Sequence, residues 1–345
     1  MNREKLNWNW SKADYPTSVN LNVFGAFVCA GGSTMGYKLA GYNHLGGIEI
    51  DPKIAYTYKA NHDPKYFYIE DIREFNKRKD LPEELYDLDI LDGSPPCTTF
   101  SMAGSREQSW GKLKYFREGQ SAQVLDDLVY VYCDTVEKLK PKTVILENVP
   151  GLIAGNALKY AIGIYERLAG IGYDVQIFSL NAATMGVPQA RERVFFIARQ
   201  RSLGWQDLKL NYDYKPVTFG EIAEQRPEVK PLIPSLAARW PYVQYGDQSF
   251  KMANCRYIGD NSKSSFFSAS IVYDDWVHCT LTSSGHSVYY QEQRNVSDQE
   301  YSRMSTFPND FDYCGASVRY VCGMSVPPLM TAAIAKEMRS QWFKV

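Results

Sequence analysis

The fold is decided by residues 22–50, which read NVFGAFVCAGGSTMGYKLAGYNHLGGIEI. A β-rich apolar run, Asn22–Val28, is followed by glycines and then by a helical pattern, Met35–Ala40. A second apolar run, Leu45–Ile50, comes next. A strand, a helix and another strand in this order predict a βαβ unit in a parallel sheet.

The same alternation continues as far as Ala198. We therefore predict an α/β fold with a doubly wound, mostly parallel sheet, in which helices cover both faces. The further strands are expected at Tyr66–Ile69, Leu88–Asp92, Thr143–Glu147, Asp174–Leu180 and Val194–Ala198. The further helices are expected at Lys53–Asn61, Leu125–Leu139 and Ala157–Ala169.

The regular pattern fails after Arg199. Residues 202–277 contain prolines, turn residues and many aromatics without a sustained helix or strand period, which predicts a smaller, irregular, β-leaning domain. The tail from Val326 begins Val-Pro-Pro and then reads as a helix, LMTAAIAKEMRSQW, expected to return to the first domain. We therefore predict three segments, 1–201, 202–277 and 278–345, of which the first and last form one domain.

Composition limits the class of protein. The chain has 345 residues, of which 45% are hydrophobic and 22% charged, as in a folded globular protein. The N-terminus has no apolar signal-peptide core, so a cytoplasmic location is expected. Seven cysteines form no CxxC pair and four histidines lack ligand spacing, so neither a disulfide framework nor a metal site is predicted. The net charge of −1 leaves a local nucleic-acid groove open.

Three strand ends suggest a nucleoside pocket. Phe27–Gly36 follows the first strand with glycines that allow close approach of a ligand, although the spacing departs from the dinucleotide fingerprint. Glu49 ends the second strand about twenty residues further on, where a carboxylate can accept from ribose hydroxyls. Asp71, after the third strand, could accept from an adenine amine.

Two further strand ends suggest a reactive thiol and an acid. The fourth strand runs into Gly-Ser-Pro-Pro-Cys, in which two prolines stiffen the chain before Cys97. The fifth strand delivers Glu147 at its carboxyl end. Neighbouring strands lie roughly 4.8 Å apart, so both side chains could reach one ring if these strands are adjacent. In an extended Gln-Ala-Arg-Glu-Arg, the side chains of Gln189, Arg191 and Arg193 would share one face.

These motifs together resemble those of the DNA cytosine-C5 methyltransferases, and they occur in that family's order. Phe27–Gly36 resembles the first cofactor motif, Pro95-Pro96-Cys97 the catalytic motif, and Glu147–Val149 the Glu-Asn-Val motif. Gln189–Arg193 fits Gln-x-Arg-x-Arg, Arg294–Phe311 resembles the ninth motif, and Gly323–Pro328 the tenth. The resemblance covers nearly all of the chain except the residues before about 20 and the region 202–277.

The resemblance implies a Rossmann-like methyltransferase fold and methyl transfer from S-adenosylmethionine to C5 of cytosine in duplex DNA. Cys97 would add to C6 of a flipped-out cytosine, and Glu147, kept protonated, would donate a proton or a hydrogen bond to N3. Arg191 and Arg193 would be the further catalytic residues. The implied cofactor residues are Phe27, Ala30, Gly31, Gly32, Glu49, Ile50, Asp71, Ile72, Pro96, Leu128, Met324, Ser325 and Val326. The implied DNA-contacting residues are Ser101, Arg106, Gln189, Arg239 and Arg256, with Lys251 and Lys263 as further candidates.

Three positions depart from the family pattern. Cys29 stands where the first motif usually has glycine, Thr98 replaces a glutamine after the nucleophile, and Met324 replaces an asparagine in the tenth motif. A pocket with altered affinity, or one that accepts a modified sulfonium donor, is therefore an alternative.

Three rival functions remain. One is a tRNA cytosine methyltransferase, disfavoured by the long middle region, and another is a silent DNA-binding relative, disfavoured by retention of Cys97 and Glu147. The third is a nicotinamide-dependent dehydrogenase, which leaves Pro-Pro-Cys and Glu-Asn-Val unexplained. As partners we expect double-stranded DNA and a cognate restriction endonuclease, with the protein itself a monomer.

Overall fold

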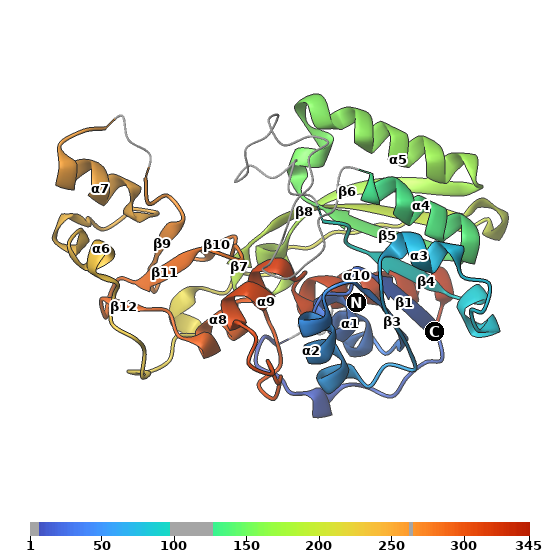
Figure 1. Ribbon diagram of the computed structural model, residues 1–345, viewed down its shortest axis with the longest axis horizontal. Helices are drawn as coiled ribbons and strands as arrows, with labels where there is room; N and C mark the ends of the chain where they lie inside the picture. The colour runs from blue at the N-terminus through green and yellow to red at the C-terminus, as the bar shows by residue number, and fades with distance from the viewer. Residues whose placement is uncertain (1–6, 97–126, 262–264) are drawn as a thin grey trace. The chain divides into compact units, whose positions relative to one another are not determined.

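The computed structural model describes residues 7–96, 127–261 and 265–345 (Figure 1). Two compact units divide the chain. The sheet unit comprises Asp14–Asn181, Glu192–Asn211 and Thr331–Val345. The appended unit comprises Met1–Ala13, Ala182–Arg191 and Tyr212–Met330.

The sheet unit is built on a seven-stranded sheet with the strand order β3-β2-β1-β4-β5-β8-β6. Strands β1 to β5 pair in parallel, whereas β8 runs antiparallel to both β5 and β6. The strands are β1 (Asn22–Ala26), β2 (Asn43–Glu49), β3 (Tyr66–Ile69), β4 (Ile90–Gly93), β5 (Thr143–Asn148), β6 (Tyr173–Asn181) and β8 (Glu192–Gln200). The predicted doubly wound, mostly parallel sheet is confirmed.

Helices cover both faces of this sheet. On one face, Leu91 of β4 packs in a core cluster with Phe75, Val136 and Leu168 from three helices. The next residue, Asp92, points to the opposite face, where the hydroxyl of Tyr37 reaches it from another helix. The α-helices are α1 (Gly32–Leu39), α2 (Pro52–His62), α3 (Ile72–Lys77), α4 (Leu128–Leu139), α5 (Leu158–Gly170) and α10 (Pro328–Met338). Shorter helical turns are η2 (Glu83–Tyr86), η3 (Pro150–Ile153), η4 (Gly155–Ala157), η6 (Arg201–Leu203) and η9 (Arg339–Phe343), while η1 (Lys12–Asp14) spans residues of both units.

The strand order creates a switch point between β1 and β4. From β1 the chain moves outward through β2 to β3, and it then returns to the other side of β1 as β4. In open α/β sheets, ligands bind outside the carboxyl ends of the strands at such a point. The glycine loop after β1 and the segment after β4 both lie at this edge of the sheet.

The appended unit contains short elements around its own small core. Leu236, Phe250, Ile271 and Tyr273 are buried in that core. Its strands are β7 (Gln189–Ala190), β9 (Ala269–Val272), β10 (His278–Cys279), β11 (His286–Tyr289) and β12 (Arg294–Asn295). Its helices are η5 (Ala182–Met185), η7 (Phe219–Glu221), α6 (Pro234–Ala237), η8 (Trp240–Tyr242), α7 (Phe250–Ile258), α8 (Asp298–Met304) and α9 (Val318–Met324).

The C-terminal segment of the chain is long and apolar. Val318–Phe343 could cross a membrane by length and composition alone. However, 72% of its most apolar window is buried inside the protein. This burial is what a core segment shows.

Candidate active site

The loop between β1 and α1 has an unusual backbone. Phe27, Cys29 and Gly31 have φ values of +59°, +49° and +92°. Left-handed values are uncommon for residues other than glycine and are often found at functional sites. At residue 31 no side chain would fit, because a Cβ there would lie 2.0 Å from Nε2 of His62. Ala30 and Gly32 are both buried beside it.

Glu49, the last residue of β2, stands beside this loop. Its two carboxyl oxygens accept from the backbone N–H groups of Cys29, at 2.9 Å, and Asp51, at 2.8 Å. Burial raises the pKa of Glu49 to about 7, although these two hydrogen bonds favour the ionised form. A backbone hydrogen bond from Ile50 acts on the same group. A carboxylate has about four acceptor sites, so Glu49 can still accept from a hydroxyl donor. Ile50, which follows it, is half-buried.

Asp71 forms the N-cap of α3 at the end of β3. Its carboxylate accepts from the backbone N–H of Arg73 at 2.8 Å and pairs with the guanidinium of the same residue at 3.1 Å. Its side chain is 27% exposed. The same guanidinium reaches Asp127 at 2.6 Å, just before Leu128 opens α4. Ile72 and Leu128 are buried.

These residues fit the adenosine part of S-adenosylmethionine. Glu49 and Asp71 end the adjacent strands β2 and β3, and the glycine loop follows β1 on the other side of β2. A buried carboxyl group, an accessible carboxylate and an apolar floor are the groups that a ribose, an adenine amine and a purine ring require.

The catalytic motif begins where β4 ends. Strands β4 and β5 are parallel neighbours, with Gly93 opposite Leu146. The side-chain amide of Asn148 donates to the carbonyl of Pro95 at 3.4 Å. Pro96 is half-buried. The predicted residues Cys97, Thr98, Ser101 and Arg106 lie outside the described residues.

Glu147 is held by an arginine from the next strand. Its Oε1 lies 2.9 Å from Nε of Arg193, and the two side chains are only 11% and 12% exposed. Strands β5 and β8 are antiparallel neighbours, with Glu147 opposite Phe195. A further bond joins Nη1 of Arg193 to the carbonyl of Glu192 at 2.6 Å. The guanidinium therefore fixes where the carboxyl group of Glu147 points.

Asp92 is an acid that the sequence analysis did not identify. It is buried in β4, accepts from the hydroxyl of Tyr37 at 3.0 Å, and lies on the same sheet face as Glu147. Burial, and next the charge of Glu147, raise the pKa of Asp92 to about 7. The signal in the sequence was an aspartate inside the apolar run Asp-Ile-Leu-Asp-Gly.

Gln189 and Arg191 belong to the appended unit, whereas Arg193 belongs to the sheet unit. The expected extended segment is interrupted, because the N–H of Arg191 donates to the carbonyl of Gln189 at 3.0 Å. Gln189 bonds the backbones of Met304 and Leu281, at 3.3 and 3.0 Å. Arg191 donates to the carbonyls of Leu281 and Gly323, at 3.2 and 3.3 Å. Gln189 and Arg191 therefore both contact the backbone of Leu281, whereas Arg193 pairs with Glu147 of the sheet unit.

The residues of the tenth motif also lie in the appended unit. Helix α9 ends at Met324, whose side chain is 38% exposed. Ser325 is buried and its hydroxyl donates to the carbonyl of Val321 at 2.8 Å. Val326 is buried as well.

Two of the DNA-reading candidates are engaged inside the appended unit. Arg256 pairs with both carboxyl oxygens of Asp247, at 2.7 and 2.9 Å. Arg239 bonds Asn254 at 2.7 Å, and its guanidinium lies 4.2 Å from the ring centre of Phe266. Lys251 is exposed on α7, and Lys263 lies outside the described residues.

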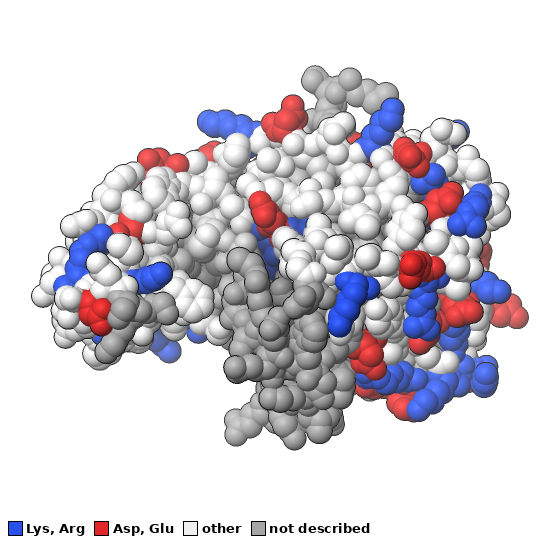
Figure 2. Space-filling view, turned by 90° about the horizontal axis from the view of Figure 1, so that it is seen from above, with Lys and Arg blue, Asp and Glu red and all other residues white. Residues whose placement is uncertain are grey.

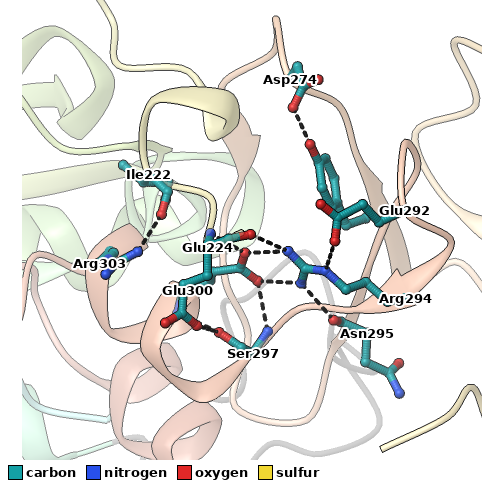
Figure 3. Close-up of polar contacts among 10 residues, drawn as sticks. Ile222, Glu224, Asp274, Glu292, Arg294, Asn295, Ser297, Glu300 and Arg303 are labelled. Atoms are coloured by element: carbon teal, nitrogen blue, oxygen red, sulfur yellow. Dashed lines mark hydrogen bonds and ion pairs between the residues drawn. The ribbon is translucent and has the colours of Figure 1, made fainter. Parts of the chain in front are cut away.

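The ninth motif forms a buried ion-pair network (Figure 3). Arg294 makes two bonds to Glu300, at 2.7 and 2.8 Å, and a third to Glu292 at 2.7 Å. Glu300 also accepts from the backbone of Ser297 and Glu224. Arg303 donates to the carbonyl of Ile222 at 2.9 Å. The network therefore ties the segment 222–224 to α8.

Charges on the surface are mixed. On the face that Figure 2 presents, Lys and Arg side chains stand among Asp and Glu side chains. Ion pairs in the described part of the chain include Arg78 with Glu70 at 2.7 Å and Arg201 with Asp174 at 3.0 Å. Such pairs leave little excess positive charge where they occur.

Known proteins resemble this chain over most of its length. The family described as C-5 cytosine-specific DNA methylase matches residues 21–340. Type II methyltransferase M1.HphI of Haemophilus parahaemolyticus is 27% identical, covering 92% of this chain and 86% of its own. Type II methyltransferase M.Sau96I of Staphylococcus aureus is 29% identical, covering 92% and 75%.

Solved structures share the fold. A DNA modification methyltransferase encoded within an E. coli prophage superposes with a TM-score of 0.66 at 20% identity, covering 93% of this chain and 99% of that one. A DNMT2 variant of Spodoptera frugiperda gives 0.65 at 16% identity, covering 92% and 99%. Because the family match spans almost the whole chain, this protein belongs to the C-5 cytosine-specific DNA methylases, the DNA (cytosine-5)-methyltransferases.

Proposed function

We propose that this protein transfers a methyl group from S-adenosylmethionine to C5 of cytosine within a specific duplex DNA sequence, through a covalent adduct with Cys97. The observation that carries the proposal is the pairing of β4 with β5. The strand that leads to Pro95-Pro96-Cys97 lies beside the strand that ends in Glu147, which Arg193 holds in place.

The proposed cofactor residues come from several strand ends and loops. Glu49 accepts from the ribose hydroxyls and Asp71 from the adenine amine, and Ile50, Ile72 and Leu128 form the apolar contacts. Phe27, Ala30, Gly31 and Gly32 supply the loop after β1. Pro96, Met324, Ser325 and Val326 are the remaining proposed cofactor residues. S-adenosylmethionine, when bound, supplies the methyl group from its sulfonium.

The chemistry on the base needs a nucleophile and a proton donor. The thiolate of Cys97 adds to C6 of the cytosine, and Glu147 donates a proton or a hydrogen bond to N3. Electron density therefore builds on C5. C5 then takes the methyl group, and loss of its proton followed by breaking of the bond between sulfur and C6 frees the enzyme. Arg193 orients Glu147, and Arg191, which joins two backbone carbonyls, supports the segment that precedes β8.

The target base must leave the helix. C6 is inaccessible inside a stacked duplex, so the cytosine rotates into the pocket at a cost of a few kcal/mol, which contacts there offset. Ser101, Arg106 and Gln189 are the proposed contacts near the base. Within 202–277, the proposed target-recognition segment, Arg239 and Arg256 are further candidates, although their present contacts favour a supporting role over direct base reading.

The cellular role follows from the relatives. Both relatives are named Type II methyltransferases. We propose that this protein, a cytoplasmic monomer, protects DNA against a cognate restriction endonuclease. Residues 1–201 and 278–345 would form the catalytic domain.

A tritium-transfer assay with labelled S-adenosylmethionine tests the proposal. We expect incorporation into duplex DNA, none into RNA, and loss of incorporation in Cys97→Ser. Label in RNA would favour the tRNA alternative, and full activity of Cys97→Ser would contradict the mechanism. Mass spectrometry of the modified base tests the donor: 5-methylcytosine as the only product excludes a modified sulfonium.

A further inference from the structure

The buried imidazole of His62 packs against the glycine loop between β1 and α1. His62 is the last residue of α2, and its side chain is 5% exposed. Its Nε2 lies 3.0 Å from the backbone carbonyl of Ala30. A carbonyl only accepts hydrogen bonds, so Nε2 must carry the proton and donate.

The same ring also fills the space under Gly31. The Cα of Gly31 is so close that a Cβ would lie 2.0 Å from Nε2 of His62. The N–H of Gly31 donates to the carbonyl of Val28 at 2.9 Å. The peptide group between Ala30 and Gly31 is therefore held at both ends, its C=O by His62 and its N–H by Val28.

Several elements fix the position of the imidazole. The ring of Tyr58 lies 4.6 Å from it, and Tyr58 stacks on Phe67 of β3 at 4.8 Å. The hydroxyl of Tyr58 lies 3.1 Å from Oγ1 of Thr34 in α1. The ammonium of Lys38 donates to the backbone carbonyl of His62 at 2.9 Å. These contacts join α1, α2 and β3 around one side chain.

We propose that His62 is a positioning residue for the cofactor: it fixes the Ala30–Gly31 peptide so that the loop presents its backbone to S-adenosylmethionine. The inference rests on the proposed function. Left-handed values at Phe27 and Cys29 make this loop a conformation that the chain does not adopt freely, so an external hydrogen bond is needed to keep it ready for the ligand. His62 touches the loop from inside the protein.

The test compares substitutions that differ in one hydrogen bond. His62→Leu removes the donor and keeps the volume, whereas His62→Gln places an amide N–H near the position of Nε2. Ile54→Ala in the same helix is the matched control, because Ile54 is buried like His62 and its backbone N–H bonds the N-cap residue Asp51. Calorimetry measures the Kd for S-adenosylmethionine in each protein, and hydrogen exchange measures protection of the amides of residues 29–36 without cofactor.

In His62→Leu we expect the Kd for S-adenosylmethionine to rise about ten-fold, which corresponds to about 1.4 kcal/mol of binding free energy. The amides of residues 29–36 should also exchange faster in this variant. His62→Gln should recover most of the affinity, and kcat at saturating cofactor should change little. Wild-type affinity in His62→Leu, or an equal loss in Ile54→Ala, would overturn the role. If His62→Leu does not fold, His62→Asn, whose shorter side chain falls short of Ala30, takes its place under the same criteria.

The two proposals fail differently. Wild-type protein that does not bind S-adenosylmethionine would reject the proposed function itself. Wild-type protein that binds it, with a His62→Leu variant that binds equally well, would reject only the role of His62.

Discussion

At the residue scale, the contact on which the proposed chemistry depends is the ion pair between Glu147 and Arg193. Both side chains are largely buried, and Nε of Arg193 lies 2.9 Å from Oε1 of Glu147. A displacement of about 1 Å at a reacting group can cost roughly 100-fold in rate. Arg193 therefore matters through the direction in which it holds Glu147.

Arg193→Ala should lower kcat by about 100-fold with little change in the KM for the cofactor. The reason is that the displaced carboxyl group of Glu147 would no longer be well placed to donate to N3 of the cytosine. Arg193→Lys should recover part of the rate. Arg201→Ala, which removes an exposed arginine paired with Asp174, is the control and should leave kcat unchanged. Steady-state methylation assays measure each value, and unchanged kcat in Arg193→Ala would contradict the assignment.

Glu49 predicts a pH dependence of cofactor binding. Its pKa is raised by burial to about 7, and hydroxyl donors bind the ionised carboxylate better, so affinity should increase as the pH rises through 7. One proton is involved, so the affinity at pH 6 should be about ten-fold below that at pH 8. Calorimetry across this range measures it, and an equal slope in Glu49→Gln would show that another group is responsible.

The same shift affects stability with a defined sign. A carboxyl group whose pKa rises on folding stabilises the folded state fully below its ordinary pKa of 4.5, and this contribution is lost as the pH rises to about 7. At neutral pH most of this contribution from Glu49 is therefore lost.

Sequence reasoning placed Glu49, Asp71 and Glu147 at strand ends, because the end of a parallel strand is a position that a pattern of apolar runs marks directly. It did not find Asp92 or His62. Asp92 lies within an apolar run and His62 at the end of a helix, so their importance depends on which elements pack against them. Such contacts between distant segments leave no local pattern.

At the scale of elements, the sheet followed from the alternation of strands and helices, since burial on both faces produces continuous apolar runs. Strand β1 ends at Ala26, two residues before the predicted end, because Phe27 has a left-handed φ. Helix α7 was not predicted within 202–277. Its buried residues, Phe250, Ala253, Asn254 and Cys255, include only a short apolar stripe.

The contacts of Arg191 are a second feature that the local sequence pattern could not predict. Alternation in Gln-Ala-Arg-Glu-Arg predicted one shared face, but it could not predict that the guanidinium of Arg191 donates to the carbonyls of Leu281 and Gly323. The carbonyl acceptors come from residues about 90 and 132 positions away in the chain. No local period could have indicated them.

The buried network of the ninth motif gives a prediction about stability. Glu300 has no exposed side-chain surface and pairs with Arg294 at 2.7 Å. Removing one partner of a buried pair leaves the other charge uncompensated, so Glu300→Ala should lower the free energy of unfolding by about 3–5 kcal/mol. Urea denaturation followed by tryptophan fluorescence measures it.

Glu292→Ala is the matched control for Glu300→Ala. Glu292 contacts the same guanidinium, but its side chain is 35% exposed, so the loss should be about 1 kcal/mol or less. Equal losses in the two variants would show that burial does not set the strength of this network.

At the scale of the whole molecule, the division of labour between a catalytic domain and a recognition segment is itself testable. The region 202–277 carries neither the family's ordered motifs nor the regular pattern of the sheet. Replacing it with the corresponding segment of the Staphylococcus aureus relative should transfer that enzyme's target sequence to this protein. Bisulfite sequencing of host DNA after expression reads the outcome, and an unchanged target would place recognition elsewhere in the chain.

In the proposed mechanism, the thiol of Cys97 attacks the cytosine, and Glu147 of the neighbouring strand donates to N3 of the same base. Duplex DNA with 5-fluorocytosine at the target site tests it most directly, because fluorine at C5 cannot leave as a proton does and the adduct therefore persists. With S-adenosylmethionine present, we predict a denaturation-resistant complex whose digest carries the DNA on the peptide with Cys97, and a greatly reduced yield in Glu147→Gln. A complex through another residue, or methylation of normal DNA by Cys97→Ser, would contradict the mechanism.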